Sequence, residues 1–254
     1  MRALYLLLGD PVAHSRSPAI HARAFELLGV DAVYAPSRVV DVPAAMRGLR
    51  ALSVTGANVT IPHKQAVIGH LDHLDESARR IGAVNCILNR DGALRGYNTD
   101  REGLLRALGR STGRAVVLGA GGSARAAVDA LKPNVTIVNR TRETAEELAR
   151  EMGVEAAGAE AVARAEVVVN CTSVGMREGE MPLDPATLQG TLVDLVYTGP
   201  TGDTALVRAA RQRGLRVIDG IEILVRQAIA SLEIWLDRPR LDELYPELRK
   251  AALS

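Results

Sequence analysis

Short apolar runs rich in β-branched residues alternate with helical patterns from one end of the chain to the other. The runs with strand character lie at 3–8, 32–39, 53–59, 84–89, 93–97, 115–118, 134–139, 166–170, 192–196 and 215–218. Helical spacing of apolar residues occurs at 18–29, 101–109, 123–132, 142–152 and 203–213, and two long helices are expected at 221–236 and 241–252. This alternation is typical of βαβ units, so the sequence predicts an α/β fold with parallel sheets.

A chain of 254 residues is long enough for two domains of ordinary size, each with its own core. The boundary is expected between Asp100 and Gly113. Polar, loop-rich candidate ligands precede it, and a nucleotide-binding pattern follows it. The division predicts a substrate domain followed by a cofactor domain.

The composition argues against several classes of function. Only 3% of the residues are aromatic and the formal net charge is +1, so the chain lacks the stacking side chains and the basic field of a nucleic-acid-binding protein. The apolar opening at 1–8 ends at once in Gly9-Asp10-Pro11 and is too short to span a bilayer, which favours a buried strand over a membrane or signal segment.

The cysteines and histidines show no pattern of a disulfide or a metal centre. Cys86 and Cys171 lie far apart and outside a C-x-x-C spacing, which is typical of free thiols in the reducing cytoplasm. His70 and His73 lack acidic or cysteine partners at ligand spacing, so no metal site is expected.

A glycine-rich turn follows the expected strand at 115–118. Its sequence is Gly119-Ala120-Gly121-Gly122-Ser123-Ala124, and a helical pattern begins directly after it. This setting fits the dinucleotide-binding fingerprint, in which the first glycine allows a tight turn and the second lets a pyrophosphate approach the backbone. A glycine-rich turn without a ligand is the alternative, and the flanking strand and helix favour the dinucleotide site.

The residues after the next strand indicate NADP rather than NAD. An NAD site places Asp or Glu roughly twenty positions beyond the first glycine, whereas this chain has Asn139-Arg140-Thr141-Arg142 there. Two guanidinium groups and a hydroxyl suit a 2′-phosphate. The alternative is that both arginines are solvated; we favour the phosphate, because a cation at a helix N-terminus opposes the helix dipole.

Lysine is rare, with three among 31 cationic side chains, and Lys64 lies in the polar segment Asn58-Val-Thr60-Ile-Pro62-His63-Lys64. Guanidinium stays protonated, whereas an ammonium group can give up and take back a proton, so this lysine favours proton-transfer chemistry. Further polar clusters are His14-Ser15-Arg16-Ser17-Pro18, Gly82-Ala-Val-Asn85 and Asn98-Thr99-Asp100.

Each polar cluster also has an ordinary structural explanation. Ser17 before Pro18 is a typical helix N-cap, Thr60 before Pro62 fits a turn, and Asn98-Thr99-Asp100 fits the start of the next helix. Their joint occurrence at strand ends and helix starts, where α/β folds collect ligands, favours a binding site.

Taken together, these motifs resemble those of shikimate dehydrogenases over nearly the full chain. The match continues through Asn170-Cys-Thr172-Ser173-Val-Gly175-Met176, Asp194-Leu195-Val-Tyr197 and Asp219-Gly220…Leu224-Val-Arg-Gln227. The resemblance implies a substrate-binding and catalytic α/β domain at 1–101, joined by the C-terminal helices at about 228–254. It also implies a Rossmann-type, doubly wound NADP-binding domain at 102–227, with a cleft between the two domains.

The resemblance further implies NADPH-dependent, reversible reduction of 3-dehydroshikimate to shikimate. Lys64 and Asp100 would be catalytic, and the substrate would be held by Ser15, Ser17, Thr60, Lys64, Asn85, Asp100, Tyr197 and Gln227. The cofactor would be held by Glu76, Gly119, Ala120, Gly121, Gly122, Ser123, Asn139, Arg140, Thr141, Arg142, Thr172, Ser173, Leu195 and Gly220. Members of the family occur as monomers and homodimers.

Two alternatives remain open. One is a quinate/shikimate dehydrogenase that prefers NAD, against which the missing carboxylate near position 139 and the presence of Arg140 argue. The other is a metabolite sensor without catalysis, against which the presence of both Lys64 and Asp100 argues, because a sensor needs no proton donor. The segment Thr198-Gly199-Pro200-Thr201-Gly202-Asp203 is longer and richer in glycine than is common in the family.

Overall fold

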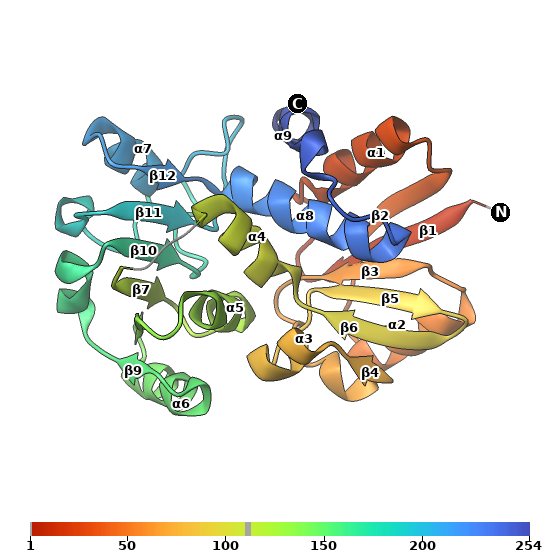
Figure 1. Ribbon diagram of the computed structural model, residues 1–254, viewed down its shortest axis with the longest axis horizontal. Coiled ribbons are helices and arrows are strands. Elements are labelled where there is room, and N and C mark those ends of the chain that lie inside the picture. Colours follow the sequence, from red (N-terminus) through yellow and green to blue (C-terminus); the bar gives the residue numbers. More distant parts are fainter. Residues whose placement is uncertain (1, 110–112) are drawn as a thin grey trace. The chain divides into compact units, whose positions relative to one another are not determined.

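Two six-stranded sheets organise the computed structural model, which describes residues 2–109 and 113–254 (Figure 1). The first compact unit takes in the described part of Met1–Gly103 together with Val225–Ala252, and the second takes in the described part of Leu104–Leu224. The chain therefore leaves the first unit within one helix, α4 (Thr99–Leu108), and returns to it within another, α8 (Gly220–Leu236).

The sheet of the first unit has the order β2-β1-β3-β5-β6-β4. Its strands are β1 (Ala3–Gly9), β2 (Ala32–Arg38), β3 (Gly56–Val59), β4 (His73–Leu74), β5 (Cys86–Arg90) and β6 (Ala93–Tyr97). Strand β1 is parallel to β2 and β3, whereas β5 runs antiparallel to both β3 and β6. The expectation of parallel sheets therefore holds for β1, β2 and β3 of this unit and is wrong for β5.

A two-residue turn explains the antiparallel pair. Asp91 and Gly92 connect β5 to β6 with φ angles of 52° and 88°. Both residues are in the left-handed region, which is the conformation of the tight hairpin turn that Asp-Gly favours. The Gly92 amide also donates to Asn89 Oδ1 at 2.9 Å.

The first unit buries apolar side chains against helices α1 (Ser17–Leu28), α2 (Val42–Ala51), α3 (Glu76–Ile81), α8 and α9 (Tyr245–Leu253). Met46 and Leu49 of α2 pack with Ala57 and Ile87 of the sheet. Trp235 of α8 donates from Nε1 to the Ile87 carbonyl at 2.9 Å. Short 3₁₀ segments lie at Ile68–His70 and Asp242–Leu244.

The second unit has a wholly parallel sheet of order β12-β11-β10-β7-β8-β9. Its strands are β7 (Ala115–Leu118), β8 (Val135–Val138), β9 (Glu155–Ala156), β10 (Val167–Asn170), β11 (Thr191–Asp194) and β12 (Val217–Ile218). Numbered within the unit, this is the 3-2-1-4-5-6 order of dinucleotide-binding folds. The strand order reverses between β7 and β10, and such folds bind ligands at that point.

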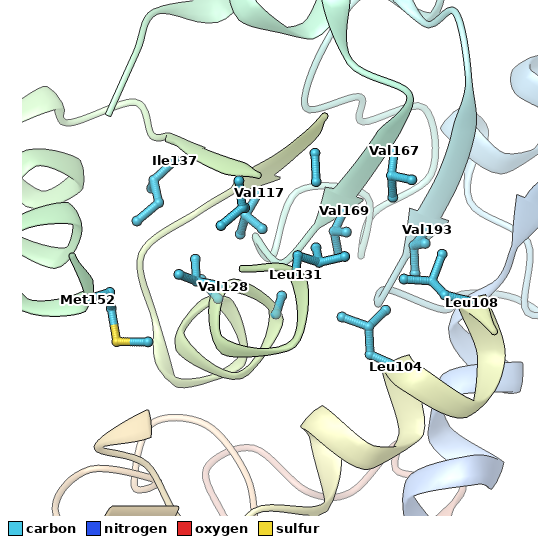
Figure 2. Packing of buried hydrophobic residues seen from close by; sticks show 14 of the residues in the cluster. Leu104, Leu108, Val117, Val128, Leu131, Ile137, Met152, Val167, Val169 and Val193 are labelled. Carbon is cyan, nitrogen blue, oxygen red and sulfur yellow. The ribbon is translucent and has the colours of Figure 1, made fainter. Parts of the chain in front are cut away.

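Alternate residues of these strands face opposite layers. Val117, Val169 and Val193 pack with Val128 and Leu131 of α5 (Gly122–Leu131), as Figure 2 shows. The other face packs against α7 (Ala205–Gln212), while α6 (Arg142–Met152) adds to the α5 layer. The 3₁₀ segments Ala159–Arg164 and Pro185–Thr187 complete the unit.

The predicted α/β fold class is confirmed, and each predicted strand and helix has a counterpart. The helix predicted at 241–252 divides into a 3₁₀ turn and α9, whose first turn contains Pro246. Proline lacks an N–H and is favoured at a helix start, so a helix begins there rather than continuing through it. No helix in the described part of the chain is long and apolar enough to cross a membrane.

Candidate active site

A largely buried ion pair joins Lys64, which follows β3, to Asp100 in the first turn of α4. The distance from Lys64 Nζ to Asp100 Oδ2 is 2.7 Å, and the two side chains are 11% and 13% exposed. A charge pair this far from solvent needs a fixed geometry, because burial penalises any misplaced charge.

The turn from Thr60 to Lys64 is tied to its surroundings at several points. The Thr60 amide donates to the Leu8 carbonyl at 2.8 Å, and a Cβ at Gly9 would lie 2.3 Å from Thr60 Cγ2. His63 Nε2 lies 2.8 Å from the Val39 carbonyl, to which it can only donate. The Lys64 carbonyl accepts from the Val84 amide at 2.8 Å. Glycine at position 9 is therefore required for Thr60 to reach its place.

Asn85 orients Asp100 from the other side. Its Nδ2 donates to Asp100 Oδ1 at 2.8 Å and to Thr99 Oγ1 at 2.9 Å. Its Oδ1 accepts from the Thr99 amide at 2.6 Å. Both oxygens of the Asp100 carboxylate thus have a donor, which leaves the carboxylate little rotational freedom.

Gln227 of α8 joins the same cluster. Its Oε1 lies 3.4 Å from both Asn85 Nδ2 and Thr99 Oγ1. Gly103 makes this approach possible, because a Cβ there would lie 2.9 Å from the Gln227 main-chain nitrogen. The start of α4 and the middle of α8 are therefore packed backbone to backbone.

Ser15 and Ser17 lie at the start of α1. Ser17 is the first residue of the helix, and its amide donates to Ser15 Oγ at 3.2 Å. Arg16 occupies the N-cap position without a side-chain cap, so the expectation that Ser17 is an ordinary N-cap is wrong. His21, one turn later, lies with its Nδ1 2.9 Å from the Ser17 carbonyl.

The glycine-rich turn of the second unit leads directly into the start of helix α5. Gly119 has a φ of 106°, and a Cβ on it would lie 3.3 Å from the Cys171 backbone. Helix α5 begins at Gly122 with Gly121 as N-cap and no side-chain cap. The first-turn amides and the helix dipole therefore suit a bound anion, and the turn fits a dinucleotide.

Two arginines, Arg140 and Arg142, lie in the segment between β8 and the first turn of α6. Asn139 Nδ2 donates to the Thr141 carbonyl at 3.0 Å, and Arg140 is exposed. Arg142 pairs with Glu146 at 2.7 Å, which raises the pKa of its guanidinium. The two arginines therefore differ in how readily they could pair with a phosphate, because Arg142 already has a carboxylate partner.

Asn170, at the end of β10, fixes the loop that follows it. Its Oδ1 accepts from Thr172 N and Oγ1 at 3.1 and 2.7 Å, and its Nδ2 donates to Asp194 Oδ1 at 2.9 Å. Asp194 is fully buried and also accepts from the Val196 amide and the Thr204 hydroxyl. Burial raises the pKa of the Asp194 carboxyl to about 6.

Gly220, at the start of α8, lies against the segment that follows β11. A Cβ on Gly220 would lie 2.4 Å from the Val196 carbonyl and 3.0 Å from the Leu195 carbonyl. Only glycine fits this contact without a shift of the backbone.

Comparison with known proteins identifies the family. A family model for the shikimate dehydrogenase substrate binding domain matches residues 7–87, and one for shikimate / quinate 5-dehydrogenase matches residues 105–176. The shikimate dehydrogenase (NADP(+)) of Moorella thermoacetica is 44% identical over 262 residues, which cover 92% of this chain and 88% of that protein. The chain belongs to the shikimate dehydrogenase family.

Solved structures agree with this membership. Shikimate 5-dehydrogenase from Thermus thermophilus, in complex with NADP(H) and shikimate, superposes with a TM-score of 0.90 at 36% identity, covering 99% of this chain and all of that one. The 5-ketofructose reductase of a Gluconobacter species superposes with a TM-score of 0.85 at 30% identity, covering 98% of both chains.

The residues predicted to hold substrate fall mainly in the first unit. Hydrogen bonds connect Lys64, Asn85, Asp100 and Gln227 directly. Tyr197 lies in the second unit, after β11. Of the residues predicted to hold cofactor, Glu76 opens α3 in the first unit and the others belong to the second.

Four buried residues of the first unit extend the cluster and were not predicted as site residues: Tyr34, Asn58, Thr99 and Ser231. Thr99 stands beside Asp100 in a motif that the sequence did single out. Tyr34 and Ser231 carry no local signal, because one lies in an edge strand and the other is a lone hydroxyl in an apolar helix.

Proposed function

We propose that this chain is an NADP-dependent shikimate dehydrogenase, which catalyses the reversible reduction of 3-dehydroshikimate to shikimate on the route to the aromatic amino acids. The observation that carries the proposal is the largely buried Lys64–Asp100 pair, whose Nζ and Oδ2 atoms are 2.7 Å apart and whose carboxylate accepts from Asn85. The pair lies in a chain whose relatives include an enzyme solved with both NADP(H) and shikimate.

The chemistry follows from what Lys64 can do. Bound NADPH supplies the hydride that reduces the substrate ketone. The alkoxide that develops on the former carbonyl oxygen needs a proton, and Lys64 Nζ donates it; in the reverse direction Lys64 accepts the proton of the hydroxyl. A positioned acid of this kind accelerates a reaction about 10²–10⁴-fold.

Asp100 assists this proton transfer, because its two carboxylate oxygens accept hydrogen bonds from different residues. Oδ2 accepts a hydrogen bond from Lys64 and Oδ1 accepts one from Asn85. The carboxylate fixes the direction of the ammonium group and offers an acceptor to a substrate hydroxyl.

The remaining first-unit residues suit a small polyhydroxy acid. Ser15 and Ser17 supply hydroxyl groups at the start of α1, where the helix dipole also favours a carboxylate. Thr60, Asn85 and Gln227 supply neutral donors and acceptors for ring hydroxyls. Tyr197 contributes a further hydroxyl from the second unit.

For the cofactor, the turn Gly119–Ser123 would hold the pyrophosphate and Arg140 would pair with the 2′-phosphate. Asn139, Thr141 and Arg142 would line the same phosphate site. Thr172, Ser173, Leu195, Gly220 and Glu76 would lie toward the nicotinamide end.

Two further proposals concern the setting of the enzyme. Cys86 is buried, and Cys86 and Cys171 lie far apart in the sequence and outside a C-x-x-C spacing, which suits a reducing cytoplasm. The working form would be a monomer or a homodimer, with small molecules as the partners of the site.

The test is absorbance of the reduced nicotinamide with purified protein, shikimate or quinate, and NADP⁺ or NAD⁺. We expect the highest kcat/KM with shikimate and NADP⁺. A preference for NAD⁺ or quinate would reassign the chain to a quinate/shikimate dehydrogenase. Reduction of 5-ketofructose by NADPH without shikimate oxidation would reassign it to the other activity found on this fold. Folded protein that binds shikimate by calorimetry but turns over none of these would be a sensor.

A further inference from the structure

Ser231, on α8, belongs to a buried hydrogen-bond network that includes residues proposed to hold the substrate. Its side chain is fully buried, and its Oγ lies 3.0 Å from Asn58 Nδ2, 3.1 Å from Thr99 Oγ1 and 3.0 Å from the Gln227 carbonyl. A hydroxyl has one proton and two lone pairs, so it can make all three of these hydrogen bonds at once.

The partners fix the direction of each hydrogen bond around Ser231. The Gln227 carbonyl can only accept, so Ser231 donates to it and accepts from both other groups. Asn58 Nδ2 donates to Ser231, and the hydroxyl of Thr99 donates its single proton there as well. The same Thr99 oxygen accepts from Asn85 Nδ2 at 2.9 Å.

The other side of Asn58 is fixed by Tyr34. The Tyr34 hydroxyl donates to Asn58 Oδ1 at 2.9 Å, and the second Nδ2 proton of Asn58 goes to the Asn85 carbonyl at 3.1 Å. The orientation of the Asn58 amide is therefore determined on both ends, and Asn58 supports Asn85 as well as Ser231.

We propose that Ser231 is a positioning residue for the substrate site, which holds Thr99 and Gln227 in the arrangement that receives substrate. The proposal rests on the proposed function, because it assigns Gln227 and Asn85 to the substrate. Without the Ser231 hydroxyl, the Thr99 proton has two other acceptors within reach: Gln227 Oε1 at 3.4 Å and Asn85 Oδ1 at 3.2 Å. A stronger hydrogen bond from Thr99 to either oxygen would shift the side-chain amide of Asn85 or Gln227 from the position in which it is proposed to bind substrate.

The variant Ser231→Ala tests this role. We expect the KM for shikimate to rise about five- to tenfold, as for the loss of a well-placed hydrogen bond, with kcat within about twofold of the wild type. The KM for NADP⁺ is expected to stay unchanged. Tyr34→Phe, which removes the hydroxyl that donates to Asn58 Oδ1, is expected to raise the KM for shikimate by a smaller factor.

Trp235→Phe is the matched control. It removes a buried hydrogen bond from the same helix, one turn further on, because Trp235 Nε1 donates to the Ile87 carbonyl. We expect it to lower Tm and leave the KM for shikimate unchanged. If Ser231→Ala behaves in the same way, with a lower Tm and an unchanged KM, Ser231 is merely structural and the proposal is overturned.

A second measurement separates this proposal from the proposed function. The side-chain NH₂ resonances of Asn85 and Gln227 in ¹H–¹⁵N spectra of the ligand-free protein should move in Ser231→Ala. Unmoved resonances overturn the positioning role whatever the enzyme's substrate is. Moved resonances in a protein that never oxidises shikimate support the positioning role and refute the proposed function instead.

Discussion

At the scale of single residues, Lys64 is distinguished by its largely buried ion pair with Asp100, at 2.7 Å. Lys64→Ala is expected to lower kcat about 10²–10⁴-fold with little change in KM, because the alkoxide that needs the proton develops only in the transition state. Steady-state kinetics measure the two constants. Lys250→Ala is the control, since Lys250 is exposed and pairs with Glu247. A loss that appears mainly in KM would make Lys64 a binding residue.

The two arginines at the start of α6 should contribute unequally to NADP binding. Arg142 has to leave Glu146, 2.7 Å away, before it can pair with a phosphate, whereas Arg140 is exposed. Arg140→Gln is therefore expected to raise the KM for NADP⁺ about tenfold or more, as for a lost charge-assisted hydrogen bond, and Arg142→Gln by less. The KM for NAD⁺, measured in parallel, should be nearly constant. If Arg140→Gln raised the KM for NADP⁺ and the KM for NAD⁺ equally, Arg140 would not contact the 2′-phosphate.

Sequence reasoning identified the residues that stand in contiguous motifs and missed those that act through the fold. Lys64 and Asp100 could be chosen because each lies in a polar cluster at a strand end or a helix start. The contact of Ser231 with Asn58 spans 173 positions, and that with Thr99 spans 132. No local pattern carries such a pairing, since it exists only once α8 lies against the sheet.

At the scale of elements, the packing of α4 on α8 determines where Gln227 lies. A Cβ at Gly103 would come 2.9 Å from the Gln227 main-chain nitrogen, so Gly103→Ala has to push the helices apart. We expect it to destabilise the protein by about 1–3 kcal/mol, as overpacking does, and to raise the KM for shikimate. Urea denaturation and steady-state kinetics measure the two effects.

Gly48→Ala provides the matched glycine control. Gly48 lies inside α2, and a Cβ there would meet nothing within 4 Å. Alanine is therefore expected to stabilise the protein by about 0.5–1 kcal/mol and leave KM unchanged. If Gly103→Ala gave the same result, the close approach of α4 and α8 would not be what positions Gln227.

Elements were predictable where a repeating pattern is long. Strands β7, β8, β10 and β11 of the second unit are mainly apolar runs, and α6 and α8 have sustained helical spacing, so their positions agree with the sequence to within a few residues. The two-residue strand β9 has no such run and was not predicted. Helix α2 was missed although Asp41 caps it and Pro43 stands in its first turn. Strands were predicted at 84–89 and 93–97, but not their pairing as an antiparallel hairpin across Asp91-Gly92.

At the scale of the whole molecule, two buried groups give the stability opposite dependences on pH. Asp194, in the second unit, has its pKa raised from 3.8 to about 6, with burial as the main cause. Its contribution to stability is fully present below pH 3.8 and is lost as the pH rises through about 6. His21, in the first unit, has its pKa lowered by burial from 6.5 to about 4, so its contribution is present above pH 6.5 and is lost as the pH falls through about 4.

Each shift corresponds to about 3 kcal/mol, so the two dependences nearly cancel between pH 4 and 6.5. Asp194→Asn removes the pH dependence that comes from the Asp194 carboxyl and keeps the shape of the side chain. Relative to the wild type, this variant should gain about 2–3 kcal/mol in free energy of unfolding between pH 4.5 and 7. His21→Asn should lose a similar amount relative to the wild type over the same interval.

Urea denaturation of the three proteins at pH 4.5, 5.5 and 7 measures these differences. All other titrating groups are common to the variants and the wild type, so they cancel in the comparison. If the two units unfold together, both substitutions act on one transition. If the units unfold separately, Asp194→Asn moves only the transition of the second unit and His21→Asn only that of the first. A difference between variant and wild type that stays constant with pH would mean that neither group is shifted in the folded protein.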